Sequence, residues 1–249
     1  MKLFDLTQPW GIQTPPWPGG KSPVIKYVNR ISSDGYSQQE FTFTTHIGTH
    51  LDGPLHFDPA GRDLASLPLD KLFGEGVVVD VSEVGPYGIY TPKNFIGKAD
   101  IRKGDILVIN TGFHIHWHKG QAPDEVAYFA KHPGPHEEFR DWCMEMQFKM
   151  LAVDCGSADH PMNTSLRQLH PLVAREAAKK LGKPLEQIFP MEMDHMMHKL
   201  FRKPYEMIHV ENAGGEIDSL LNKRVLIGCF PLKVIDGESS PCRLVAFQP

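Results

Sequence analysis

The stretch "HIGTHLDGPLH", residues 46–56, concentrates three histidines, an aspartate, two glycines and a proline. The side chains capable of metal or proton chemistry stand at 46, 50, 52 and 56, always an even number of residues apart. Even steps place side chains on one face of an extended chain, whereas a helix would align 46 with 50 but not with 52. The glycines, Pro54 and the strand-like "EFTFTT" before the stretch also weigh against a helix. We therefore expect an extended segment that presents four groups on one face.

This face predicts a metal centre. The imidazoles of His46 and His50 and the carboxylate of Asp52 form a three-ligand set that leaves positions open for water, as a catalytic metal site requires. His56, beyond the proline, is then placed to act as a base or an acid rather than as a ligand. The alternative is a chance cluster, because the chain contains 13 histidines. Four groups in phase favour the metal centre.

Charge and cysteine content narrow the class of partner. The 249 residues include 26 Lys and Arg against 30 Asp and Glu, a formal charge of −4 without any block of like charges. This balance disfavours nucleic acid and an anionic membrane surface and favours a small-molecule substrate. No apolar signal segment or membrane-length apolar run is present. The four cysteines form no CxxC pair, so we expect a reducing, cytoplasmic setting.

Outside this stretch, short apolar runs alternate with amphipathic segments. Runs rich in β-branched residues predict strands at 77–81, 105–110, 150–155, 205–212 and 224–234. Helices are predicted at 123–132, 136–147 and 165–182, the last bent or restarted at Pro171. Since no linker is visible, we expect one mixed α/β domain.

The histidine-rich stretch also resembles a known family. It matches, at all seven signature positions, the HxGTHxDxPxH signature of the cyclase family of metal-dependent hydrolases, which includes bacterial kynurenine formamidase, isatin hydrolase and certain lactamases. Further similar segments are "TPPWPG" (14–19), "VDCGSADHP…LRQLH" (153–170), "IHVEN" (208–212) and "PLKVIDGESSPCR" (231–243). The resemblance implies a single domain over 1–249 with a β-rich, barrel-like sheet flanked by helices (a swivelling β/β/α fold), assembled as a homodimer or homotetramer.

The resemblance implies a ligand set for the metal. His46 and His50 would hold one ion, and Asp52 would bridge or serve two. His170 would bind a second ion, and Glu211 would close the shell. Nitrogen and oxygen ligands of this kind suit zinc or manganese, as one or two ions per subunit.

The resemblance also implies the groups that handle the substrate. His56 would be the catalytic acid/base, and Trp17, from the amino-terminal loop, would pack on the substrate. Phe57 and Phe113 are candidates to help it grip a flat molecule.

The resemblance also implies that residues 171–207 form an insertion, because in the formamidases the second-metal histidine and the glutamate lie close in sequence. Within it, "HMMH" offers His195 and His198 three residues apart, a spacing that can chelate on a helix. The alternative, which we favour, is that the neighbouring methionines form apolar surface for a lid or a subunit contact, with the histidines at its edge.

Other candidates receive smaller roles. His114 is kept as a pocket candidate, His209 is expected to be structural or to support a ligand, and Asp154 to orient a ligand histidine. Cys155 has no base adjacent in sequence, so a covalent mechanism is disfavoured.

The expected reaction is hydrolysis of the carbon–nitrogen bond of a small cyclic or formyl amide, such as a lactam, an imide, an isatin-like ring or an N-formyl arylamine. A metal-activated water would attack while His56 moves the proton. Two alternatives stay open: a lactone or ester hydrolase, or non-hydrolytic cyclase, with the same centre, and a non-catalytic metal-dependent binding protein.

Overall fold

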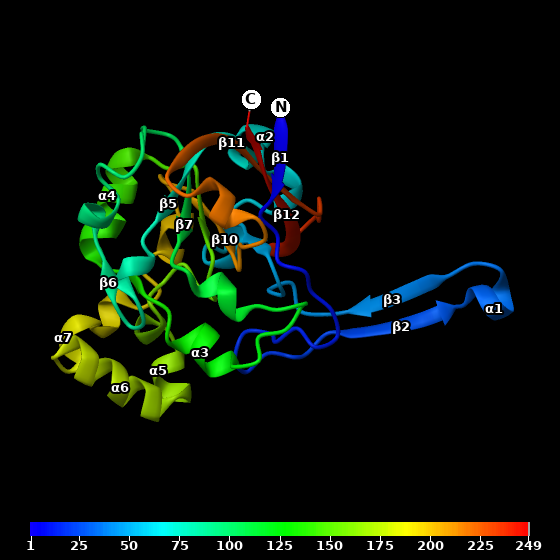
Figure 1. The fold of residues 1–249 in the computed structure, drawn as a ribbon, viewed down its shortest axis with the longest axis horizontal. Coiled ribbons are helices and arrows are strands. Elements are labelled where there is room, and N and C mark those ends of the chain that lie inside the picture. The colour runs from blue at the N-terminus through cyan, green and yellow to red at the C-terminus, as the bar shows by residue number, and fades with distance from the viewer. Residues whose placement is uncertain (249) are drawn as a thin grey trace.

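Seven of the eight strands of the main sheet form a closed ring in the computed structural model, which describes residues 1–248 (Figure 1). Around the ring these strands are β12 (Ser239–Gln248), β11 (Lys223–Pro231), β5 (Phe73–Asp80), β7 (Ile106–Asn110), β9 (Met150–Val153), β10 (Ile208–Glu211) and β4 (His50–Asp52). β12 closes the ring because it pairs with both β11 and β4. The eighth strand, β1 (Lys2–Asp5), pairs with the end of β12, so the two chain ends lie side by side.

The ring combines parallel and antiparallel pairs. β5, β7, β9 and β10 run parallel to one another, and the other neighbours are antiparallel. β7, β9 and β10 are completely buried, and β5 is buried from Gly76 to Val79, as their continuous apolar runs require. The predicted α/β domain with a barrel-like sheet is therefore confirmed, and each of the five predicted strands is present with shifted ends.

Strand alternation divides the core between the inside and the outside of the ring. In β5, Val78 belongs to one apolar cluster, whereas its neighbours Val77 and Val79 belong to another that packs under α4. β9 repeats this pattern, with Ala152 in the first cluster and Leu151 in the second. Both faces of these strands are therefore covered.

Helices lie on the outside of the ring and at one end of it (Figure 1). They are α2 (Leu69–Leu72), α3 (Glu125–Ala130), α4 (Glu137–Met146), α5 (Leu166–Leu169), α6 (Pro171–Leu181) and α7 (Leu185–Ile188). The predicted helix 165–182 is divided between α5 and α6, because Pro171 begins a new helix and Gly182, at φ 73°, ends it. Among residues 1–248, no helix combines the length and the apolarity needed to cross a bilayer.

A hairpin arm projects from the body of the molecule (Figure 1). It consists of β2 (Val24–Asn29), the single turn α1 (Ile31–Asp34) and β3 (Gln38–Thr42). A separate short pair, β6 (Ile89–Tyr90) and β8 (Gly134–Pro135), lies beside α4. The arm leaves every residue of β3 exposed, so the body of the chain does not cover it.

Candidate metal centre and active site

The histidine-rich stretch is extended only in its middle, at β4. Gly48 turns the chain sharply with φ 57°, and a Cβ there would lie 2.9 Å from the Trp10 Cβ. After β4, the 3-10 turn η1 (Pro54–His56) folds back, with the His56 N–H donating to the Gly53 carbonyl at 3.0 Å. The expectation of one continuous extended face is therefore wrong in detail, since two bends bring the four side chains together.

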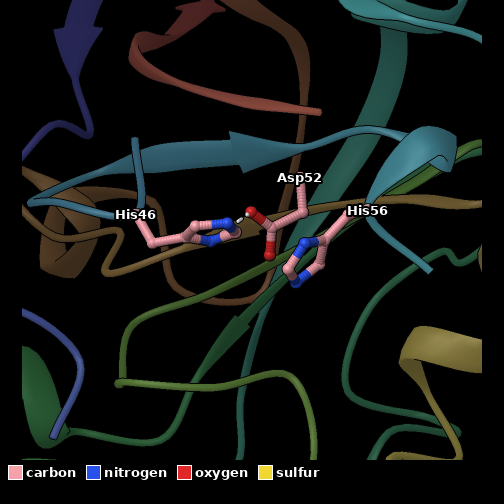
Figure 2. Close-up of side chains that lie close together, drawn as sticks. All are labelled: His46, Asp52 and His56. Atoms are coloured by element: carbon pink, nitrogen blue, oxygen red, sulfur yellow. Dashed lines mark ion pairs between the residues drawn. The ribbon is translucent and has the colours of Figure 1, made fainter. Parts of the chain in front are cut away.

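Three donor atoms of this stretch converge on one point. His46 Nδ1 lies 3.2 Å from His50 Nε2 and 3.0 Å from Asp52 Oδ1, and His50 Nε2 lies 3.4 Å from the same oxygen. Figure 2 shows the Asp52 carboxylate between the rings of His46 and His56. Ligands about 2.1 Å from a tetrahedral zinc ion are about 3.4 Å apart, which matches this spacing.

A second group of donor atoms faces the other oxygen of Asp52. His198, from the turn η8 (His198–Phe201), places Nε2 3.8 Å from Asp52 Oδ2 and 3.5 Å from Glu211 Oε1. Glu211 ends β10, and its Oε2 lies 3.7 Å from His50 Nε2. Asp52 and Glu211 thus each face both groups of donors.

The hydrogen bonds of the histidines direct lone pairs into the centre. His50 Nδ1 donates to the Gly48 carbonyl at 2.9 Å, and His198 Nδ1 donates to Asp159 Oδ2 at 2.6 Å. His46 Nε2 donates to Glu238 Oε2 at 2.9 Å. When each ring is neutral, its outer nitrogen carries the hydrogen and its inner nitrogen is an acceptor, as in histidines that bind metal ions.

Burial makes this cluster unfavourable without a cation. No hydrogen-bond donor satisfies either oxygen of the buried Asp52 within residues 1–248. Burial and the nearby Asp52 charge raise the pKa of Glu211 well above its ordinary value. Burial lowers the pKa of His50 to about 4, so this ring is neutral and can coordinate. Burial opposes protonation of His46, but Asp52 and Glu238 raise its pKa to about 11, which reflects strong local negative charge. The residues fit a divalent cation.

A cavity of about 350 Å³ opens over the centre. Its lining includes the predicted substrate residues Trp17 and Phe57, and also Phe129 and His195. Gly156 forms part of the wall, where a Cβ would come within 2.3 Å of the Phe129 ring. The floor is therefore polar and the walls are aromatic.

Three of the predicted candidates lie outside the cavity. His170 is at the junction of α5 and α6 and does not line the cavity, because Pro171 starts a helix in the outer layer there. Phe113 is buried in the core cluster under α4, with its ring 5.2 Å from that of His116. His114 is also outside the cavity and is held between Asp154, at 2.8 Å, and Asp218, at 3.2 Å.

Sequence reasoning missed two residues of the site. The methionines around His198 favour a surface edge, yet His198 stands only 13 positions before Glu211, the close spacing that the family resemblance implies for a second-metal histidine. Glu238 lies in the "DGESSPCR" segment, which the sequence marks only by its resemblance to the family. The short separation from Glu211 was the available signal for His198, and nothing in the spacing marked Glu238.

Comparisons with known sequences identify the family of this chain. Residues 4–160 match the profile of the Cyclase family, described as "Putative cyclase". Kynurenine formamidase of Erythrobacter litoralis (strain HTCC2594) is 26% identical over 247 residues, which cover 98% of this chain and 93% of that protein. Kynurenine formamidase of Bacillus cereus (strain ATCC 10987 / NRS 248) is 25% identical over 244 residues, covering 97% and 95%.

Solved structures share the fold. An isatin hydrolase bound to the product analogue thioisatinate superposes with a TM-score of 0.76 at 21% identity, covering 100% of this chain and 92% of that one. Isatin hydrolase A from Ralstonia solanacearum gives a TM-score of 0.74 at 19% identity, covering 98% and 91%. Because the family profile spans more than half of the chain and the relatives span nearly all of it, this chain belongs to the cyclase family of metal-dependent hydrolases.

Proposed function

We propose that the chain hydrolyses the carbon–nitrogen bond of a small, flat cyclic or N-formyl amide, using two divalent ions, zinc or manganese. The kynurenine formamidase relatives and the isatin hydrolase structures indicate a hydrolase acting on carbon–nitrogen bonds other than peptide bonds. The proposal rests on one observation: three histidine lone pairs converge on two buried carboxylates. Two ions are favoured because His46 and His50 face Asp52 Oδ1, whereas His198 faces Oδ2.

The chain's own residues define what each ion would contact. His46, His50 and Asp52 would hold one ion, and Asp52, His198 and Glu211 the other. A divalent cation bound there lowers the pKa of water from about 15.7 toward about 7 and polarises a carbonyl oxygen.

His56 is the proposed proton carrier. One of its ring nitrogens lies within 4.8 Å of donor atoms of His46 and Asp52, where an attacking water would sit. It would take the proton from that water and return it to the leaving nitrogen. Positioned proton transfer of this kind contributes about 10² to 10⁴ in rate.

The cavity supports a compact, neutral, flat substrate. Trp17, Phe57 and Phe129 supply aromatic surface on the walls. No lysine or arginine stands among the described residues that line it, so a free carboxylate on the substrate would find no fixed cationic side chain. We therefore place an isatin-like ring, a lactam or an imide ahead of an amino-acid amide such as N-formylkynurenine.

Metal removal and reconstitution test the proposal. Chelated protein should lose hydrolysis of isatin and cyclic imides, and added zinc or manganese should restore it, with elemental analysis giving two equivalents per chain. Full activity in protein shown to be metal-free would refute the proposal. A chain that binds metal but turns over none of the amides, lactones or esters offered would instead be a binding protein.

Replacing His56 tests the division between ligands and proton carrier. His56→Ala should retain both metal equivalents and lower kcat by about 10² or more. Loss of metal in this variant would make His56 a ligand and contradict the assignment.

Assembly and cellular location are further parts of the proposal. We place the chain in the cytoplasm, a choice supported by four cysteines that are all free and buried. A homodimer is supported by the exposed apolar arm. No nucleic acid or membrane partner is proposed, since the charge pattern favours neither.

A further inference from the structure

Glu238 lies on the loop between β11 and β12, and this loop is fastened to the histidine-rich stretch. The Gly53 N–H donates to the Glu238 carbonyl at 2.8 Å, and the Leu64 N–H donates to the Gly237 carbonyl at 2.9 Å. Gly53 directly precedes η1, the turn that ends at His56. The loop and the turn are therefore held together, and the backbone position from which the Glu238 side chain extends is fixed.

The Glu238 carboxylate accepts hydrogen bonds through both oxygens. Oε2 lies 2.8 Å from His56 Nδ1 and 2.9 Å from His46 Nε2. Oε1 accepts from the Thr45 hydroxyl at 2.7 Å and from the Ser239 hydroxyl at 2.5 Å. One carboxylate thus joins the proposed proton carrier to a proposed metal ligand.

We propose that Glu238 is a positioning residue that fixes the tautomer of His56, with the hydrogen on Nδ1 and Nε2 left as the base. The inference rests on the proposed function of His56 and deepens it. A carboxylate only accepts hydrogen bonds, so the ring nitrogen that faces it must carry the hydrogen. In a neutral imidazole the other nitrogen is then the acceptor. Glu238 therefore selects which nitrogen can take a proton from water.

The same oxygen also fixes where His56 stands. Because Oε2 accepts from both rings, it holds the His56 ring 4.4 Å from the His46 ring, centroid to centroid. Because Glu238 is hydrogen-bonded to both the ligand His46 and the base His56, the two rings keep a constant separation while the substrate enters. Glu238 thus acts on the rate of proton transfer rather than on substrate binding.

Two variants and a control separate this role from a structural one. In Glu238→Gln, the amide oxygen can still accept from both rings, and the amide N–H₂ can donate to the hydroxyls of Thr45 and Ser239, so the geometry is kept and the charge is lost. Glu238→Ala removes the acceptor. Asp236→Asn is the matched control, because Asp236 is an exposed carboxylate on the same loop whose φ of 56° asparagine tolerates well.

The expected kinetic result is a loss confined to kcat. With the preferred amide and saturating zinc, Glu238→Ala should lower kcat by about 100-fold and Glu238→Gln by about 10-fold, with KM within threefold and two zinc equivalents retained. Asp236→Asn should match the wild type. If instead Glu238→Ala loses zinc, or if KM rises while kcat is unchanged, the proposal is overturned.

A double variant tests whether Glu238 acts through His56. His56→Ala with Glu238→Ala should be no slower than His56→Ala alone, because the residue that Glu238 positions is already gone. A further loss in the double variant, by the factor seen for Glu238→Ala alone, would overturn the proposal. Should Glu238→Ala fail to fold, Glu238→Gln carries the same comparison.

A measurement without turnover separates this proposal from the proposed function. Nitrogen-15 NMR of zinc-loaded protein should place a hydrogen on His56 Nδ1 in the wild type and in Glu238→Gln, and move the population toward Nε2 in Glu238→Ala. A wild-type Nδ1 without hydrogen overturns the role of Glu238. Absence of all amidase activity overturns the proposed function but leaves the tautomer result standing.

Discussion

His198 has the surroundings of a supported metal ligand. The buried Asp159 accepts from its Nδ1 at 2.6 Å and from its backbone N–H at 3.3 Å, and also from the Met197 N–H at 3.0 Å. Burial raises the pKa of Asp159, but these hydrogen bonds and the His198 ring outweigh it and keep the carboxyl ionised. Asp159 therefore fixes both the backbone and the ring of His198, and its Nε2 faces Asp52 and Glu211.

Paired alanine variants should distinguish His198 from His170. His198→Ala should lose one of two metal equivalents and lower kcat by about 100-fold, because the second ion loses its only nitrogen ligand among the residues described here. His170→Ala should retain both equivalents and activity within twofold. Elemental analysis and steady-state kinetics provide the measurement, and loss of metal in His170→Ala would contradict the present assignment.

The part of the site that lies in short sequence motifs was predictable. His46, His50, Asp52 and His56 belong to one short motif, and Glu211 follows from a strand resemblance. His198 and Glu238 stand 146 and 186 residues beyond Asp52, so their spacing from the motif cannot place them in the site, and only the separation of 13 residues from Glu211 marked His198. Predicting Phe113 as a pocket residue failed for a different reason, since a side chain next to a buried strand can enter either layer of the core.

At the level of elements, the arm formed by β2, α1 and β3 would not be stable as an isolated hairpin. A two-stranded hairpin is marginal in water, and both outer edges of this one lack a neighbouring strand. Large apolar side chains remain exposed along it: Val24, Tyr27, Val28, Ile31, Tyr36 and Phe41. Its base is anchored where Phe41 and Phe43 pack edge-on against Trp10. A second copy of the chain, related by a twofold axis, would cover the arms reciprocally.

Removing the arm tests this assembly. Residues 24–42 replaced by a short Gly-Ser linker should give a monomer by light scattering, whereas the full chain should be a dimer, because the arm supplies the apolar surface of the interface. The double variant Val28→Lys with Ile31→Lys should also shift the protein from dimer toward monomer, but less completely than removal of the arm. A monomeric full chain, or a dimer that survives removal of the arm, would refute the proposed interface.

The elements differ in how clearly the sequence marks them. β7 and β9, and β5 over residues 76–79, are buried on both faces, so their apolar runs stand out from the chain around them. β2 and β3 have no buried face and therefore no hydrophobic alternation, and only the strand-like "EFTFTT" hinted at the arm. The pairing of β12 with β4 joins segments nearly 190 residues apart, so ring closure followed from family resemblance rather than from pattern.

Across the whole molecule, neutral histidines are buried away from the metal centre. Burial lowers the pKa of His132 to about 4 and that of His160 to about 3, from an ordinary 6.5. His160 Nδ1 accepts from the Met162 N–H at 3.1 Å, an arrangement that only an unprotonated nitrogen allows. In the unfolded chain both rings take a proton below about pH 6.5, whereas in the folded chain they do so only near pH 4 or below.

The stability that these two neutral rings contribute should therefore be fully present above pH 6.5 and should be lost as the pH drops toward 4. At pH 5 each of these histidines should lower the free energy of unfolding by about 2 kcal/mol relative to pH 7.5. Urea unfolding of chelated protein measures the effect without a contribution from metal release. His132→Asn, which cannot titrate, should show about half of the dependence due to the two rings. A pH dependence in His132→Asn equal to that of the wild type would disagree with this account.

The proposed ligands of the second ion come from distant parts of the chain, so the ion would affect the stability of the folded state. Asp52, His198 and Glu211 come from the first quarter and the last quarter of the chain. An ion held by all three would act as a removable cross-link that closes a loop of about 146 residues, in a chain whose four cysteines form no disulfide. Such an ion would bind the native chain and not the unfolded one, so the free energy of unfolding would rise with the free metal concentration. Metal supply would then set the lifetime of the protein as well as its chemistry.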